Sequence, residues 1–572
     1  MSTITQTNQR TFLPAHFIVT DWNTLQPFYD QVLHQSIANK ADLEAWLLKI
    51  NELDSVVKED LAWRYIKMTC NTADKELADR YNYFMEEISP KLSEYGNLLN
   101  RKYYDCPFRQ ELSDAAIQIL DQLVANEIEL FRAENVSLHS ESAVKCQEYA
   151  GIIGAMTIEL DGETLTVQQA SARLQSPDRS LREKVWQKIS ERRLQDENSL
   201  DNLFDELRTI RNQIARNAGF DSYTDYRFKE LARFDYTKEN CQAFHNAVEK
   251  VVKPLYEKLS ATRKEKLGLA ELRPWDTRVD IWGDQPLRPF TDGDDLLQKT
   301  IQLYHRLSPE IGKMIETMNR MGHFDLTSRV GKAPGGYNYP LHESGVPFIF
   351  MNAVGTQSDL KTMVHECGHA IHSFLNKDLP LNVYKDVPSE VAELASMSME
   401  LISMDYWDTF YSNSDDLRRA KLNQLTGTIT ILPWIAAVDA FQNWIYDHPN
   451  HSIPERREVW NQIYDRFHGE ELNWSGYENV KKASWQMQLH IYEVPFYYIE
   501  YGIAQLGALQ VWKNYKQDAQ KGLAQYLKGL SVGYTMPIPD VYATAGIAFD
   551  FSEAMMRDLF NFVEQEYNQL IQ

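Results

Sequence analysis

Helical periodicity is the feature that most narrows the folds open to this chain. Apolar residues recur at three- and four-residue steps, separated by charged residues, over positions 41–68, 114–131 and 181–219. The last stretch ends on Gly219, a residue suited to terminate a helix. No fixed-period repeat accompanies the pattern, which counts against a solenoid. The sequence therefore predicts a mainly α-helical protein.

Strand signals are few and local. Alternating residues flank Asp161-Gly162, a pair suited to the two-residue turn of a β-hairpin. A second apolar and aromatic run, 347–351, lies shortly before a cluster of histidines. We expect a few short strands or hairpins, with the second run near the functional site.

The length predicts more than one lobe. The chain has 572 residues, and a single hydrophobic core stops growing at roughly 250–300 residues. We place a boundary near Ser176-Pro177-Asp178. This gives an N-terminal helical lobe over 1–175 and a larger domain over 176–572 that carries the histidines.

Charge and composition exclude several classes of partner. The 59 basic and 81 acidic residues leave a net charge of −22, which disfavours nucleic acid and anionic membranes as partners. No apolar run approaches the ~20 residues of a membrane span. The five cysteines are scattered without a C-x-x-C pair, and the first residues resemble no secretory signal. We therefore expect a cytoplasmic protein with reduced thiols.

The stretch KTMVHECGHAIHSF, 361–374, carries a metal-site pattern. On a helix expected near 359–375, capped by Thr356 or Ser358, His365 and His369 lie one turn apart on one face. Two imidazoles so placed can bind one zinc ion. Glu366 is rotated by about 100°, so it can take a proton from water without binding the metal.

A third ligand is expected from the segment after Pro388. Glu390, Glu393 and Glu400 follow at +3 and +7 spacing, so they form one stripe on a helix. One of these carboxylates is expected to bind the metal, and another to orient a ligating histidine. A third histidine ligand fits poorly, because that pattern needs glycine at position 372 and histidine at position 375, where this chain has histidine and leucine.

The same segments resemble the thimet-oligopeptidase-type zinc peptidases, and among them the oligoendopeptidase F branch. The resemblance rests on GKAPGGYNYP, PFIFMN, HECGHAIHS, VAELASMSME, HIYEVPFYYIEYGIAQLGALQ and VYATAGIAFDF, which together span 331–551. It implies a mainly α, two-lobed, zincin-type fold with one zinc ion in a deep internal channel. Such channels admit short unstructured peptides.

The resemblance also implies roles for single residues. His365 and His369 become zinc ligands, Glu366 the general base, and Glu393 the third ligand, because Ser396 and Glu400 reproduce the family's spacing. Glu400 and His372 are then candidates to support the ligands from behind. The remaining matches are donors to the reacting carbonyl (His490, Tyr498, with Tyr497 as its alternative, and Tyr501) and substrate contacts (Gly335, Gly336, Tyr337 and Phe348). The strand 347–351 is expected to lie beside an extended peptide, as an added strand would.

These observations predict a zinc-dependent endopeptidase that cleaves internal bonds of short oligopeptides. One alternative is a carboxypeptidase or peptidyl-dipeptidase, which needs a fixed cation for the free carboxylate, and the sequence identifies none. Another is a peptide-binding protein with structural zinc, which gains nothing from a base such as Glu366. Nothing in the sequence indicates the oligomeric state.

Overall fold

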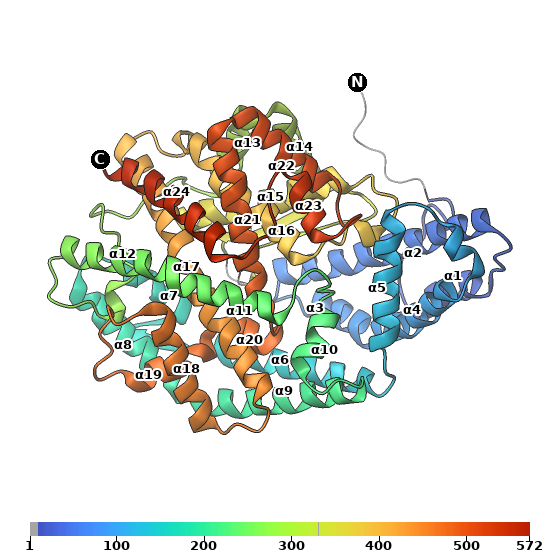
Figure 1. Cartoon of the computed structure of the whole chain (residues 1–572), viewed down its shortest axis with the longest axis horizontal. Coiled ribbons are helices and arrows are strands. Elements are labelled where there is room, and N and C mark those ends of the chain that lie inside the picture. Colours follow the sequence, from blue (N-terminus) through green and yellow to red (C-terminus); the bar gives the residue numbers. More distant parts are fainter. Residues whose placement is uncertain (1–9, 330, 334) are drawn as a thin grey trace. The chain divides into compact units, whose positions relative to one another are not determined.

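The computed structural model describes residues 10–329, 331–333 and 335–572. The chain divides into two compact units. Unit 1 comprises Met1–Glu129, Leu287–Leu417 and Gly507–Phe549, and unit 2 comprises Leu130–Pro286, Arg418–Leu506 and Asp550–Gln572. Helices dominate both units (Figure 1), which confirms the predicted mainly α class.

Unit 1 contains two long helical segments around a small sheet. Its first part holds α1 (Trp22–His34), α2 (Lys40–Cys70), α3 (Lys75–Tyr83), η1 (Phe84–Ile88), α4 (Ser89–Tyr104), η2 (Pro107–Glu111) and α5 (Ala116–Leu130). Its later parts hold α13 (Gly293–Leu307), α14 (Pro309–Met321), β3 (Phe324–Thr327), β4 (Tyr337–Tyr339), β5 (Phe348–Ala353), α15 (Gln357–Asn376), η6 (Asn382–Tyr384), α16 (Ser389–Ile402), η7 (Ser403–Thr409), α22 (Ala519–Ser531) and α23 (Ile538–Thr544).

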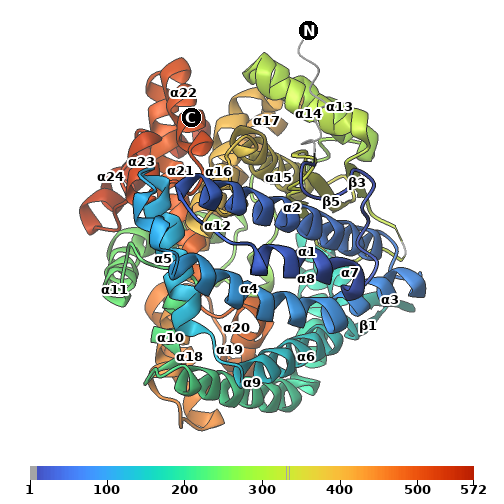
Figure 2. The ribbon, with the colours of Figure 1, turned by 90° about the vertical axis from the view of Figure 1, so that its right-hand side faces the viewer.

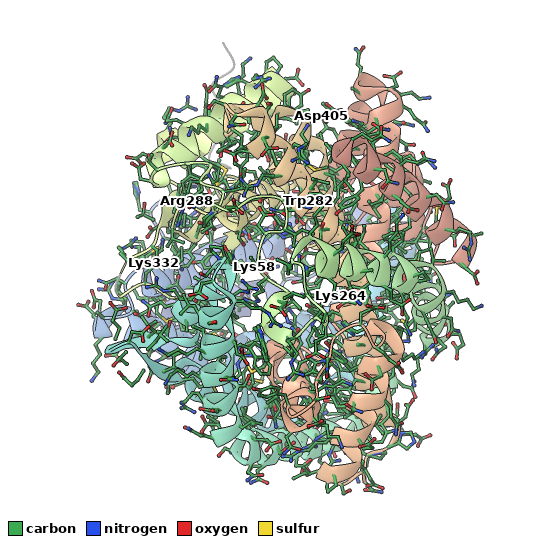
Figure 3. All side chains as sticks on the ribbon, turned by 90° about the vertical axis from the view of Figure 1, so that its left-hand side faces the viewer. Lys58, Lys264, Trp282, Arg288, Lys332 and Asp405 are labelled. Carbon is green, nitrogen blue, oxygen red and sulfur yellow. The ribbon has the colours of Figure 1, made fainter. Side chains whose placement is uncertain are left out.

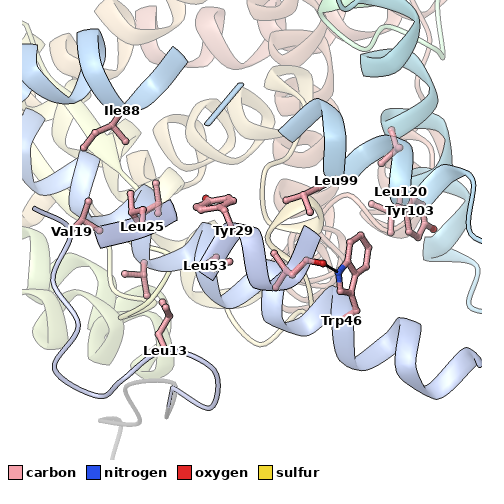
Figure 4. Packing of buried hydrophobic residues seen from close by; sticks show 14 of the residues in the cluster. Leu13, Val19, Leu25, Tyr29, Trp46, Leu53, Ile88, Leu99, Tyr103 and Leu120 are labelled. Carbon is pink, nitrogen blue, oxygen red and sulfur yellow. Dashed lines mark hydrogen bonds between the residues drawn. The ribbon is translucent and has the colours of Figure 1, made fainter. Parts of the chain in front are cut away.

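The N-terminal helices of unit 1 form their own core. Buried residues of α1, α2, α4 and α5, helices that Figure 2 shows together, pack in one hydrophobic cluster. Figure 4 shows Trp46 at one end of this cluster, where its indole N–H donates a 2.7 Å hydrogen bond to the Val32 carbonyl. Helix starts are fixed locally, since Asp21 and Asn39 cap α1 and α2 through their side chains. This cluster confirms the helical pattern read over 41–68 and 114–131.

The sheet of unit 1 has the strand order β3-β5-β4. The strand β5 is central, parallel to β3 and antiparallel to β4, so both of its edges are already paired. The expectation that a peptide adds beside this strand is therefore wrong for β5 itself, and only the outer edges of β3 and β4 remain for such pairing. The sequence could not distinguish these cases, because an apolar run of this kind suits a buried central strand as well as an edge strand.

Unit 2 is built mainly from helices and one hairpin. Its elements are α6 (Asn135–Gly154), β1 (Thr157–Leu160), β2 (Glu163–Thr166), α7 (Val167–Ala172), η3 (Arg173–Gln175), α8 (Arg179–Gln195), α9 (Glu197–Asn217), α10 (Tyr223–Glu230), α11 (Lys238–Ala247), η4 (Val248–Val252), α12 (Lys253–Lys266), η5 (Pro274–Asp276), α17 (Ser414–Asp447), α18 (Ile453–His468), α19 (Glu478–Ala483), η8 (Ser484–Met487), α20 (Leu489–Glu493) and α24 (Glu553–Ile571). The helix α21 (Tyr498–Gln517) begins in unit 2 and ends in unit 1.

Two local predictions can be checked in unit 2. The strands β1 and β2 pair antiparallel around Asp161 and Gly162, which confirms the predicted hairpin. The pattern over 181–219 belongs to two helices, α8 and α9, which meet at Asp196. Gly219 adopts a φ of +89° just beyond the second helix, in agreement with its predicted role.

Two expectations from composition also bear on the structure. Within the described part of the chain, no helix has the length and apolar character needed to cross a bilayer. All five cysteines are free thiols. The proposed boundary between residues 175 and 176 stays a prediction.

Candidate metal centre

The helix α15 presents the histidine motif as the sequence predicts. Thr356 caps its first turn, where the hydroxyl accepts from the Asp359 N–H and the Asp359 carboxylate accepts from the Thr356 N–H. His365 and His369 follow one turn apart on one face, with their ring centroids 5.0 Å apart. Local capping and periodicity therefore suffice to place both imidazoles together.

The helix α16 brings a carboxylate to the same place. Glu393 Oε2 lies 3.3 Å from His365 Nε2 and 3.8 Å from His369 Nε2. One ligand atom from each of the three residues lies within 4.8 Å of the others. Ligand atoms around a tetrahedral zinc ion are about 3.4 Å apart, given metal–ligand bonds of about 2.0–2.2 Å. The donor types and their separations therefore fit one divalent ion.

A glycine lets the two ligand-bearing helices approach. A Cβ atom added at Gly368 would lie 2.6 Å from Ser396 Cα and 2.7 Å from the Ala395 carbonyl oxygen. Real Cβ atoms do not approach backbone atoms so closely, so only glycine permits this helix contact at position 368. The side chain of Ser396 also donates a 2.9 Å hydrogen bond to Glu393 Oε2, which fixes the carboxylate.

His365 is held from behind by a carboxylate. Its Nδ1 lies 2.8 Å from Glu400 Oε1, which leaves Nε2 for the metal. Lys361, one turn earlier on α15, lies 3.1 Å from the other oxygen of Glu400. Burial alone would lower the pKa of His365, but hydrogen bonds and charge from Glu393 and Glu400 raise it well above its ordinary value. The electrostatics thus favour positive charge between these carboxylates, as a bound cation would supply.

Glu366 is placed as a candidate base beside the donor group. It is buried, and burial raises the pKa of its carboxyl to about 7. The backbone N–H of Asn338 in β4 donates to it and partly opposes that shift. A carboxyl with a pKa near neutrality is suited to accept and return a proton. The sequence offered no sign of Asn338, because its contribution is a backbone group.

His372 and Glu390 lie outside the donor group. His372 is buried, hydrogen-bonded to the backbone of Leu530 in α22, and burial lowers its pKa to about 3. The backbone carbonyl of Glu390 accepts a 3.0 Å hydrogen bond from Tyr542. Of the three carboxylates considered for the third ligand, the structure thus brings Glu393 close to the Nε2 atoms of both histidines. A supporting role for His372 stays a prediction.

The glycine-containing loop approaches α15 closely. A Cβ atom at Gly336 would lie 3.2 Å from the methyl carbon of Thr362, and Gly335 adopts a φ of +93°. Tyr337 stacks on Phe350 with ring centroids 4.8 Å apart and shares a 2.6 Å hydrogen bond with Thr69. Phe348 is buried in a hydrophobic cluster with Ala62, Ile66, Leu341 and Phe350. Substrate contact by these residues stays a prediction.

The predicted donors gather around His490 in unit 2. Tyr497, Tyr498 and Tyr501 all contact its ring, with centroids 5.9, 4.9 and 5.8 Å away. Burial raises the pKa of Tyr498 to about 12, so it stays a hydroxyl donor at neutral pH. The sequence left Tyr497 and Tyr498 as alternatives, and both flank the imidazole here.

A hydrogen-bond chain fixes the tautomer of His490. Trp434 Nε1, which can only donate, lies 2.8 Å from Gln488 Oε1, so the amide group of Gln488 faces His490 Nδ1 at 2.7 Å. The neutral imidazole then carries its proton on Nε2 and presents a donor there. Gln488 was missed in the sequence, although it lies two residues before the histidine.

The backbone before these tyrosines is strained. Phe496 adopts a φ of +67°, which is uncommon for a bulky residue. Its N–H donates a 2.8 Å hydrogen bond to Gln442 Oε1, and Arg233 donates to its carbonyl. Such strain persists only where neighbouring contacts enforce it, so Gln442 and Arg233 help to set the start of the tyrosine segment.

Two family models match the sequence of this chain. Residues 172–560 match the family model described as peptidase family M3, and residues 12–131 match the peptidase M3 N-terminal domain. The chain belongs to peptidase family M3. This confirms the resemblance inferred from the sequence motifs.

Relatives within family M3 include oligoendopeptidases. The chromosomal oligoendopeptidase F of Lactococcus lactis subsp. cremoris is 24% identical over 324 residues, covering 55% of this chain and 52% of that protein. The oligoendopeptidase F homolog of Borreliella burgdorferi is 21% identical over 488 residues, covering 81% and 78%. The chain thus matches about half the length of the first of these relatives.

Solved structures extend the likeness to the whole chain. PZ peptidase A, solved with an inhibitor, is 26% identical with a TM-score of 0.90, covering 99% of both chains. Oligoendopeptidase F from Enterococcus faecium is 17% identical with a TM-score of 0.63, covering 96% of this chain and 97% of that chain, and supports the fold. These two structures confirm the fold class.

Proposed function

We propose that this M3 protein is a zinc-dependent endopeptidase that hydrolyses internal bonds of short, unstructured oligopeptides. The observation that carries the proposal is the group of His365, His369 and Glu393, with the buried carboxyl of Glu366 next to it on α15. Two imidazoles and one carboxylate are the donor set of catalytic zinc sites, which keep a position open. The names of the relatives, oligoendopeptidase F among them, support the choice of peptide substrates.

Each side chain has a separate task in this mechanism. His365, His369 and Glu393 would hold the zinc ion, which when bound would supply a Lewis acid for the carbonyl and for water. Glu366 accepts the proton of the attacking water and delivers it to the leaving amine. Glu400 holds the His365 ring so that Nε2 stays directed at the metal.

The family resemblance assigns the stabilisation of the tetrahedral oxyanion to His490 and its neighbouring tyrosines, and we propose that role for them here. The Nε2–H of His490 is a donor because Nδ1 accepts from Gln488. The hydroxyls of Tyr498, or its alternative Tyr497, and Tyr501 supply further donors. Fixed donors of this kind are worth about 10²–10³ in rate when one is removed.

The substitution Glu366→Gln tests the proposal. We expect it to leave zinc content unchanged and to lower kcat for a fluorogenic peptide by about 10²–10⁴, the contribution of a general base. Full hydrolysis by the zinc-loaded variant would contradict the role of Glu366 and favour a peptide-binding protein with structural zinc.

A second assay separates internal cleavage from trimming. A peptide with an amidated C-terminus is incubated with the enzyme and the product masses are read. We expect cuts at internal bonds. Products that form only from the free acid would identify a carboxypeptidase or peptidyl-dipeptidase instead.

A further inference from the structure

Unit 2 contains a cavity of about 540 Å³ that none of the roles above uses. Small-molecule sites typically measure about 300–1,000 Å³. The walls come from α7, η3, α8, α12, α17, α18 and α24, together with residues 272–282 and 472–474. Figure 3 labels two positions on these segments, Trp282 in the wall and Lys264 on α12.

The walls of the cavity are largely aromatic. Trp186 contacts Trp275 and Trp474, with ring centroids 5.6 and 6.1 Å apart, and Tyr464 lies 5.9 Å from Trp474. All four rings line the space. Rigid rings offer large contact areas to an apolar ligand at small entropic cost.

Three arginines line the same space, and no Asp or Glu among the described residues does. Arg263 donates to backbone carbonyls, 3.3 Å from that of Asp276 and 2.6 Å from that of Val279. Arg193 and Arg278 form no ion pair within the described parts of the chain, and the buried Nε of Arg193 has no hydrogen-bond partner. The cavity therefore holds guanidinium donors that the protein does not satisfy.

Neighbouring carboxylates are committed elsewhere. Asp276, near the cavity wall, binds Arg179 at 2.9 Å and Arg182 at 3.0 Å. Asp280 binds Arg419 at 2.9 Å. The acids of this segment thus form no ion pair with Arg193 or Arg278.

Electrostatics agree with this geometry. Burial, and then the charge of Arg278, lowers the pKa of Arg193 to about 10. The side chain of Arg278 is exposed, but the protein around its guanidinium group removes part of its hydration and lowers its pKa as well. Two guanidinium groups that line one cavity and repel each other are costly unless an anion binds between them, and arginine suits a planar carboxylate in particular.

One face of α17 connects the cavity with His490. Asn423, Thr426, Thr430 and Trp434 recur at three- and four-residue steps and all line the space. The indole of Trp434 then donates to Gln488, which in turn donates to His490. A ligand held against this face therefore touches Trp434, whose hydrogen bond orients the Gln488 amide that faces His490.

We propose that this cavity binds the free C-terminal carboxylate and the apolar last side chain of a short peptide, with Arg193 and Arg278 holding the carboxylate. The inference rests on the proposed function for its link to hydrolysis, because it names the class of peptide preferred. The stripe of Asn423, Thr426 and Thr430 makes one wall of the cavity polar. The aromatic walls take the side chain.

A single carboxylate fits this site better than a polyanion. The whole chain carries a net charge of −22, which repels a multiply charged ligand. Inorganic phosphate would use the arginines but leave the aromatic walls without contact. A carboxylate on an apolar body uses both features.

Binding of N-acetyl-L-phenylalanine and of its amide tests the proposal without any hydrolysis. Binding is followed by intrinsic tryptophan fluorescence, because several tryptophans line the cavity. We expect the acid to bind at least about tenfold more tightly than the amide, and Arg278→Met or Arg193→Met to remove that difference. Arg278→Lys should restore part of it. The matched control is Arg216→Met, since Arg216 lies exposed on α9 outside the cavity.

Three results would overturn the inference. The first is equal affinity for the acid and the amide. The second is a folded Arg278→Met variant that still binds the acid more tightly than the amide by the full factor. The third is inorganic phosphate that competes for the cavity at a lower concentration than N-acetyl-L-phenylalanine needs to bind. A second arm compares a pentapeptide acid with its amide as a substrate, and we expect amidation to raise KM about tenfold with kcat retained. If the zinc-loaded unaltered protein cleaves no peptide but still binds the acid more tightly than the amide, the proposed function is refuted and the cavity assignment stands. The reverse result would refute the cavity assignment alone.

Discussion

The contact at Gly368 makes a specific prediction for the substitution Gly368→Ala. Carbon atoms in contact lie about 3.5–4.0 Å apart, whereas the new Cβ would lie 2.6 Å from Ser396 Cα. The helices α15 and α16 must therefore separate by roughly 1 Å, because backbone atoms cannot rotate away. Overpacking costs about 1–3 kcal/mol, and the higher helix propensity of alanine offsets about 1 kcal/mol. We expect a net cost near the upper end, about 2 kcal/mol.

That cost should be measurable as metal affinity. His365 and His369 lie on α15 and Glu393 lies on α16, so bound metal holds the two helices at the strained distance. The metal-free variant can relax, and the strain is then paid on binding. A cost of about 2 kcal/mol corresponds to zinc binding about 30-fold weaker, measured by competition with a chromogenic chelator at fixed pH.

The control is another helical glycine of unit 1. Gly96 lies within α4, and a Cβ atom there would meet nothing within 4 Å. Gly96→Ala should leave zinc affinity unchanged and slightly stabilise the protein. If Gly368→Ala binds zinc as tightly as the unaltered protein, close packing at this glycine does not set the geometry of the ligands.

Three further predictions concern the same region. Glu393→Gln should lose zinc, whereas Glu390→Gln, the same change one turn earlier on α16, should retain it, as measured by metal content after gel filtration; the opposite order would make Glu390 the ligand. Glu400→Gln should weaken zinc binding about 10- to 100-fold, and an unchanged affinity would remove its orienting role. The buried imidazole of His372 has a lowered pKa of about 3, so below pH 6.5 only the unfolded chain gains its proton, and stability falls as pH falls toward 3. At pH 5 this amounts to about 2 kcal/mol; His372→Gln should remove that part of the acid sensitivity in urea titrations at pH 7.5 and 5, and identical pH dependence in both proteins would show that His372 is protonated in the folded state.

The histidines of the candidate metal centre could be predicted to lie together because local periodicity places them on one face of a helix. His365 and His369 lie one turn apart on any helix, and the capping residue Thr356 is readable in the sequence. Glu393 comes from a second helix, and its stripe and its match with the family spacing predicted that it lies near the two histidines, as it does. The position of Lys361 near this site could also have been predicted, because it lies one turn before His365 on the same face of the helix.

Other parts of the sites depend on tertiary contacts that no spacing encodes. The N–H of Asn338 supports Glu366 from a strand, and a backbone donor leaves no mark in the residue type. Arg193 and Arg278 come from separate segments and line the same cavity only in the folded chain. For this reason the sequence offered no cation for a peptide carboxylate, although the chain contains one pair suited to it. The position of β5 at the centre of its sheet is likewise a property of pairing partners.

All three donors of the metal centre, and the carboxylate behind His365, come from the single stretch 365–400, within unit 1. Metal retention therefore reports on the integrity of this short stretch and its immediate packing, and says little about His490 and its tyrosines. Under the proposed function, a variant that retains its full zinc content can therefore still lack peptidase activity. Assays that screen such proteins need an independent probe for each half of the chemistry.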